Sequence, residues 1–175
     1  FDVAHQRQPD LQLLLVGDGS LRASTQDDVR RRKLDDHVTF VGAKSPVELP
    51  DWYRAADLFV LSSWSEGLPN VLREAVACGR PFVSTDVGSV REIADSHGNA
   101  PFAELVPVGD ATAMAMAIER VLRPEYLAIA QSLSCRSWRD TARDLVALLR
   151  TLRGEDCGSA ESGGHGENVS HEVTV

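Results

Sequence analysis

Short apolar runs and segments with helical hydrophobic spacing alternate along residues 1–152. The run LQLLLVGDG at residues 11–19 is continuous, which is typical of a strand buried on both faces of a parallel sheet. The predicted strands are residues 11–19, 37–42, 57–63, 81–86 and 103–110. The predicted helices are residues 20–35, 51–56, 69–78, 88–94 and 111–122, with two more in 124–152 broken near Ser137. This alternation predicts an α/β fold with a doubly wound, mainly parallel sheet.

Four turns follow the predicted strands at one edge of this sheet. Ligands of open α/β sheets bind beyond the carboxyl ends of the strands, so these turns form the expected site. They are Gly17-Asp18-Gly19, Gly42-Ala43, Ser63–Gly67 and Asp86–Ser89. The first turn begins like a dinucleotide fingerprint, but Arg22 stands where the third glycine is required, so we expect a strand-ending turn that borders a ligand.

The stretch SSWSEGLPNVLREAVACGRP at residues 62–81 places two glutamates around the start of a helix. Pro69 suits the first helical turn, where its missing N–H group costs nothing. The amides of Asn70 and Val71 then lack a partner inside the helix, and the helix N-terminus carries about half a positive charge. This combination predicts a phosphate-binding site, with Glu66 in the loop immediately before it.

Glu74 lies five residues beyond Pro69, at the margin of an apolar helix face. At about 100° per residue, that face consists of Val71, Leu72, Ala75 and Val76. We therefore expect Glu74 to be half-sheltered, and the two oxygens of its carboxylate can accept from a vicinal diol such as ribose. These features predict a bound nucleoside diphosphate, with its ribose on Glu74, its phosphates at the helix start and an attached sugar beside Glu66.

Several segments resemble the C-terminal, nucleotide-binding domain of family 4 glycosyltransferases. The signature of that family is two glutamates separated by seven residues, and EGLPNVLRE at residues 66–74 matches it. Further matches follow in order: LLLVGDGSLR (13–22), VTFVG (38–42), YRAADLFVLSSWSEG (53–67), EAVACGRPFVSTDVGSVREI (74–93) and LVPVGDATAMAMAI (105–118). The resemblance covers about residues 1–152 and implies one Rossmann-like half of a two-domain, GT-B type enzyme.

The resemblance implies a retaining transfer of a sugar from a nucleotide-diphosphate donor, without a metal or other cofactor. It implies that Glu66 is the catalytic-site glutamate beside the donor sugar and that Glu74 binds the ribose. The implied donor-binding residues are Gly67, Leu68, Pro69, Asn70, Val71 and Glu74, with Gly17, Gly42 and Ala43 near the base or the donor. The acceptor, a glycan, a lipid or a small molecule, is expected on an N-terminal domain.

The chain departs from the family pattern in two ways. The family usually has an arginine and a lysine in a GR…K segment just before the point where this chain begins, and neither they nor the N-terminal domain is present. We therefore expect an N-terminally truncated domain that binds donor but hardly turns over alone. The usual Gly-Gly pair after the fourth strand is Gly88-Ser89 here, which puts that donor contact in question.

Charge and cysteine content narrow the class of protein. The net charge is −8, but residues 154–175 hold five acids and no lysine or arginine, so the rest of the chain carries only −3. We expect residues 153–175 to be a disordered acidic tail, and we expect no nucleic-acid partner. Three cysteines without a CxxC pair favour a reducing compartment, so we expect a cytoplasmic protein. The amphipathic segment 136–153 leaves peripheral contact with the inner face of a membrane as an alternative.

Other interpretations stay open at this stage. A phosphorylase, a synthase or an epimerase uses the same two-domain plan, and a non-catalytic nucleotide-binding module would keep the same fold. A response-regulator-like domain ranks last, since Asp18 lacks the acidic partners that such a site needs. We expect Trp52, Tyr53 and Trp64 to pack in the core or between helix and sheet.

Overall fold

The computed structural model describes residues 1–98, 101–135 and 138–153. It divides into two compact units, residues 1–135 and residues 136–175, which are considered separately. The predicted disordered tail, apart from Arg153, lies outside the described residues.

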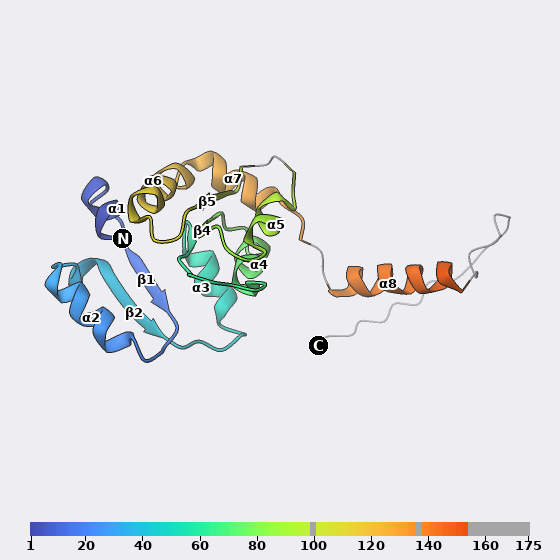
Figure 1. Cartoon of the computed structure of the whole chain (residues 1–175), viewed down its shortest axis with the longest axis horizontal. Coiled ribbons are helices and arrows are strands. Elements are labelled where there is room, and N and C mark those ends of the chain that lie inside the picture. The colour runs from blue at the N-terminus through green and yellow to red at the C-terminus, as the bar shows by residue number, and fades with distance from the viewer. Residues whose placement is uncertain (99–100, 136–137, 154–175) are drawn as a thin grey trace, which may run out of the picture. The chain divides into compact units, whose positions relative to one another are not determined.

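The first unit alternates helices and parallel strands (Figure 1). Its strands are β1 (Leu13–Val16), β2 (Val38–Gly42), β3 (Phe59–Leu61), β4 (Phe82–Thr85) and β5 (Ala103–Val106). Its helices are α1 (Asp2–Arg7), α2 (Arg22–Arg31), α3 (Leu49–Ala55), α4 (Asn70–Ala77), α5 (Val90–Asp95), α6 (Ala111–Val121) and α7 (Pro124–Ser132), with a 3-10 turn, η1 (Asp35–His37). The predicted α/β fold with parallel strands is confirmed.

The hydrogen-bonded strands form two parallel sheets. In one sheet β1 pairs with β2, with Leu13 opposite Val38. In the other, β4 lies between β3 and β5, with Phe59 and Ala103 both opposite Phe82. All strands within a sheet therefore run in the same direction. The turn after each strand lies at the carboxyl edge of the sheet to which that strand belongs.

The core of the unit surrounds β4, whose four residues are all buried. Successive strand residues face opposite sides. Phe82 packs with Leu72 of α4 on one side, whereas Val83 packs with Ala117 of α6 on the other. Helices α4 and α5 thus contribute to one core cluster and α6 to the second, as the layers in Figure 1 show.

The prediction that the first strand is buried on both faces is wrong. Leu14 and Val16 of β1 are 39% and 41% exposed, while Leu13 and Leu15 are half-buried. The apolar run does form a parallel strand, which among the described residues pairs with β2 alone, and the face that carries Leu14 and Val16 is exposed. The pattern therefore identified the strand but not its burial.

The second unit contributes one described helix, α8 (Trp138–Leu152). Four of its leucines follow helical spacing and are all about half exposed or more. They are Leu145, Leu148, Leu149 and Leu152. No helix in the described part of the chain is both long and apolar enough to cross a bilayer.

Candidate functional site

The loop between β3 and α4 holds Glu66 in a fixed setting. The Ser63 hydroxyl donates a 2.6 Å hydrogen bond to Oε1 of Glu66. The Thr85 hydroxyl, from the buried end of β4, donates to the Ser63 carbonyl at 2.6 Å. Glu66 is half-buried, and its carboxylate is oriented through Ser63 and Thr85 by the ends of two adjacent strands. Among the described residues, side-chain hydrogen bonds engage Oε1 and not Oε2.

The turn after β4 closes against the same loop. The backbone N–H and the hydroxyl of Ser89 both donate to the Gly67 carbonyl, at 3.1 and 2.8 Å. Gly88 has a φ of +55°, and a Cβ built there would overlap the Glu66 carbonyl. A glycine is therefore required at position 88, and Ser89 fastens the Glu66 loop to the β4 turn.

Helix α4 begins at Asn70, with Pro69 as its N-cap residue in extended conformation. Leu72, Ala75 and Val76 are buried and fix the helix on the sheet, as the helical spacing predicted. Val71 is 37% exposed, so its predicted place on the buried face is wrong. The exposed Leu68 and Asn70 lie beside it at the helix start, where the first amides have no partner within the helix.

Glu74 is exposed rather than half-sheltered, because the buried face of α4 is narrower than predicted. One of its oxygens is nonetheless held, since the Tyr53 hydroxyl donates to Oε2 at 2.9 Å. Burial, and then this hydrogen bond, raise the pKa of Tyr53 well above its usual range, so the phenol stays a donor. Among the described residues, no side chain donates a hydrogen bond to the second oxygen of Glu74.

The remaining predicted donor residues form a separate pair of turns. The N–H of Gly17 donates to the Gly42 carbonyl at 2.9 Å, and both glycines have positive φ, +131° and +79°. Ala43 is exposed next to them. The prediction that all four turns share one edge of a single sheet is wrong. Gly17, Gly42 and Ala43 lie together at the carboxyl edge of the β1–β2 sheet, and residues 63–70 lie with 86–89 at the carboxyl edge of the β3–β4–β5 sheet. Among the described residues, no hydrogen bond joins the two groups.

A family model described as Glycosyl transferases group 1 matches residues 2–124, which include both glutamates and all four turns. The chain belongs to this family.

Curated relatives and a solved structure fit this group 1 assignment. N-acetyl-alpha-D-glucosaminyl L-malate synthase of Bacillus anthracis is 36% identical over 118 residues, 67% of this chain and 30% of that protein. GDP-mannose-dependent alpha-mannosyltransferase of Mycobacterium tuberculosis is 31% identical over 150 residues, 82% of this chain and 37% of that protein. Sucrose-phosphate synthase of Thermosynechococcus elongatus superposes with a TM-score of 0.67 and 30% identity, over 89% of this chain and 42% of that one.

This group 1 chain therefore spans well under half the length of these three proteins. The match to the family model covers residues 2–124, which carry Glu66 and Glu74.

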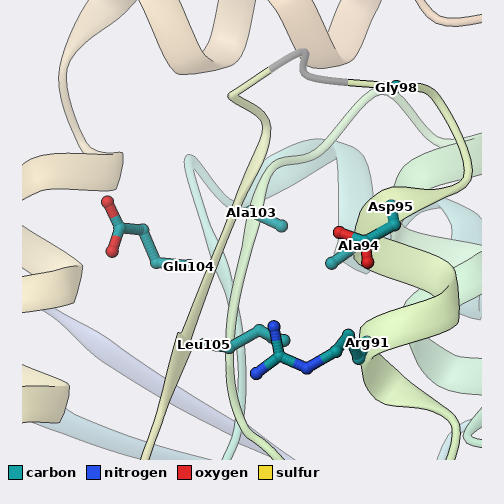
Figure 2. Close-up of a pocket in the computed structure, with 7 residues that line it drawn as sticks. All are labelled: Arg91, Ala94, Asp95, Gly98, Ala103, Glu104 and Leu105. Atoms are coloured by element: carbon teal, nitrogen blue, oxygen red, sulfur yellow. The ribbon is translucent and has the colours of Figure 1, made fainter.

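A hollow of about 420 Å³ lies elsewhere in the group 1 domain, between α5 and β5. Figure 2 shows the side chains that line it. Its lining residues are Arg91, Ala94, Asp95, Gly98, Ala103, Glu104 and Leu105, none of which was predicted as a site residue. The Glu104 carboxylate lies on the other side of β5 from Arg91 and Asp95. Within the residues that the structure describes, no three His, Cys, Asp or Glu side chains gather as metal ligands would.

Sequence analysis missed four hydroxyls that hold the site, those of Tyr53, Ser63, Thr85 and Ser89. Tyr53 packs in the core as expected. Its hydrogen bond to Glu74 could not be predicted from the local sequence, because the two residues are 21 positions apart. Ser63 precedes Glu66 by three residues, a spacing at which a local side-chain hydrogen bond is a reasonable guess. Trp64, by contrast, was expected to pack in the core or between helix and sheet, and it is 79% exposed.

Proposed function

We propose that this domain binds a nucleoside-diphosphate sugar and takes part in transfer of its sugar to an acceptor, with retention of anomeric configuration. Glu66 faces the sugar and Glu74 accepts from the ribose diol. Gly67, Leu68 and Pro69 line the diphosphate, whose oxygens bind the amides of Asn70 and Val71. The observation that carries the proposal is the pair of oriented carboxylates, each with one oxygen engaged by a protein hydroxyl, on either side of the α4 start.

The chemistry of this arrangement suits departure of a nucleoside diphosphate. The leaving group gains negative charge as the glycosidic bond breaks, so its stabilisation must increase in the transition state. Preorganised amides at a helix N-terminus supply about 3–4 kcal/mol per well-placed donor. A carboxylate such as Glu66 can accept from sugar hydroxyls and stabilise positive charge that develops at the anomeric carbon.

The proposal includes no metal or other cofactor. The sequence contains no Asp-x-Asp pair of the kind that would hold a divalent ion between diphosphate oxygens. Donor binding should therefore be insensitive to EDTA.

Two features of the wider reaction are part of the same proposal. The named relatives include a GDP-mannose-dependent mannosyltransferase, which supports a nucleotide-sugar donor. Because the relatives are longer than this chain, the acceptor (a glycan, a lipid or a small molecule) is proposed to bind outside the matched part. The protein is proposed to act in the cytoplasm, and the exposed leucine stripe of α8 suits contact with the inner membrane surface.

An amide NMR titration with UDP, GDP and ADP, with and without EDTA, tests the proposal. One nucleotide should shift the amides of residues 67–74 and of the Gly42 turn. Glu74→Ala should weaken its binding about tenfold, which corresponds to about 1.4 kcal/mol. Glu125→Ala, which removes an exposed glutamate from the first turn of α7, serves as the matched control. The absence of shifts with all three nucleotides at millimolar concentration would contradict donor binding.

A further inference from the structure

The ring of Tyr53 is anchored independently of any ligand. Tyr53 lies on α3 and is only 8% exposed. Its ring meets Phe59 of β3 edge-on, with the ring centroids 5.4 Å apart. The hydroxyl at the end of this fixed ring donates to Oε2 of Glu74 at 2.9 Å. The donor of this hydrogen bond is therefore rigid, while its acceptor is an exposed side chain on another helix.

We propose that Tyr53 is a positioning residue that orients the Glu74 carboxylate for the ribose diol and so gives the domain its preference for ribonucleotides. This inference rests on the proposed function, because it assigns a second residue to the ribose side of that site. Tyr53 itself does not touch the nucleotide.

Orientation by Tyr53 matters for binding because a glutamate side chain loses conformational entropy when a ligand fixes it. A free glutamate side chain loses up to about 2 kcal/mol of rotamer freedom when a ligand fixes it. Tyr53 fixes Oε2 before the ligand arrives, so less of that cost falls on binding. The other oxygen of Glu74, together with a remaining lone pair on Oε2, stays able to accept from the two ribose hydroxyls.

A neutral donor suits this role better than a cation. An arginine would engage both carboxylate oxygens and compete with the ribose for them. No salt bridge of Glu74 occurs in the described part of the chain. Tyr53 therefore orients the carboxylate without neutralising its charge, and it occupies only one acceptor site, on Oε2.

The test compares a ribonucleotide with its 2′,3′-dideoxy form in wild type and in Tyr53→Phe. The probe is whichever of UDP, GDP and ADP binds wild type most tightly by NMR titration. Tyr53→Phe keeps the buried ring and removes only the hydroxyl. We expect affinity for the ribonucleotide to fall about 3- to 10-fold, while affinity for the dideoxy form changes less than about twofold. In a Glu74→Ala background, which has no side-chain acceptor for the Tyr53 hydroxyl, Tyr53→Phe should have no further effect on either ligand.

The chain provides a matched control in Tyr126→Phe. Tyr126 is its only other tyrosine and also donates to a glutamate, Oε1 of Glu104, at 2.9 Å. This variant should leave both affinities unchanged. An equal loss for the two ligands in Tyr53→Phe, or no loss for either, would overturn the positioning role while leaving the proposed function intact. A wild type that binds no nucleotide would overturn the proposed function and this inference with it.

Discussion

Two tyrosine–glutamate pairs in this domain have the same hydrogen bond and different surroundings. Tyr53 donates to Glu74 across α3 and α4, and Tyr126 donates to Glu104 across α7 and β5, each at 2.9 Å. Glu104 also accepts two hydrogen bonds from Arg120 of α6, at 2.9 and 3.1 Å. Glu74 has no such cation among the residues described and is exposed. One glutamate thus has both oxygens engaged by three hydrogen bonds, and the other is oriented by one and keeps more acceptor capacity.

This difference separates a structural carboxylate from a binding one. Hydrogen bonds with Arg120, and then Tyr126, lower the pKa of Glu104 against the opposing effect of burial, so its charge is stabilised within the fold. A carboxylate whose lone pairs are already used has little to offer a ligand. Glu74 keeps that capacity because, among the described residues, its side chain accepts from a single neutral donor. The local sequence gives no sign of this distinction.

The largest expected loss of stability concerns a third glutamate, Glu66, which extends the comparison. Glu66 also accepts from a hydroxyl, but its backbone is confined by Gly88. Gly88→Ala should lower the free energy of unfolding by about 2–5 kcal/mol. Positive φ costs an alanine about 1–2 kcal/mol, and overlap with the Glu66 carbonyl costs about 1–3 kcal/mol more. Urea unfolding measures the loss, and amide spectra of residues 63–67 report displacement of the loop.

Gly98→Ala is the control for this variant. Gly98 also has positive φ, +70°, but a Cβ there meets nothing within 4 Å, so only the backbone strain should appear. If both alanine variants lose the same stability, the contact between Gly88 and the Glu66 loop is not what fixes that loop.

The same comparison shows how far sequence reasoning extends. The spacing of apolar residues located α4 and all five strands, and the residues around Glu66 indicated the family. It failed for Val71 and for β1, since exposure depends on which segments pack alongside, and that is not encoded in local periodicity. The Tyr53 hydrogen bond was missed for the same reason, because its partners are 21 residues apart and lie on different helices.

A smaller loss of stability is expected from Arg120→Ala, which removes the two hydrogen bonds that Arg120 donates to Glu104. Loss of charge-assisted hydrogen bonds to a partly buried carboxylate should cost about 1–2 kcal/mol of unfolding free energy, reduced from about 1.5–3 because the Arg120 side chain is 38% exposed. The lowered pKa of Glu104 stabilises the fold above the ordinary glutamate pKa of about 4.3, and this is lost as the pH falls through the lowered value. The gap between variant and wild type should therefore narrow in acid unfolding experiments.

Arg7→Ala is the matched control for this prediction, because it removes a more exposed ion pair. Arg7 pairs with Glu119, which also lies on α6, but both side chains are about half exposed, so its loss should cost under about 0.5 kcal/mol. Arg120→Ala should leave nucleotide affinity unchanged within about twofold. A clear drop in nucleotide affinity would mean that the Tyr126–Glu104 pair belongs to the binding site. Glu104 could then no longer be distinguished from Glu74 as a purely structural carboxylate.

The smallest expected effect on stability at neutral pH comes from the two tyrosines themselves. They are distinguished by how far their pKa values are raised. Burial raises the pKa of both tyrosines above the usual value of about 10, and it does so more strongly for the buried Tyr53 than for the half-buried Tyr126. A raised pKa stabilises the folded state below the unfolded value, and that contribution is lost as the pH rises through the folded value. Alkaline titration of tyrosinate absorbance resolves the two, because Tyr126→Phe and Tyr53→Phe each leave one tyrosine. Tyr53 should stay protonated to higher pH than Tyr126, until the protein unfolds. The opposite order would mean that the Tyr53 hydroxyl is open to solvent, and a hydroxyl in water cannot hold Glu74 in one orientation.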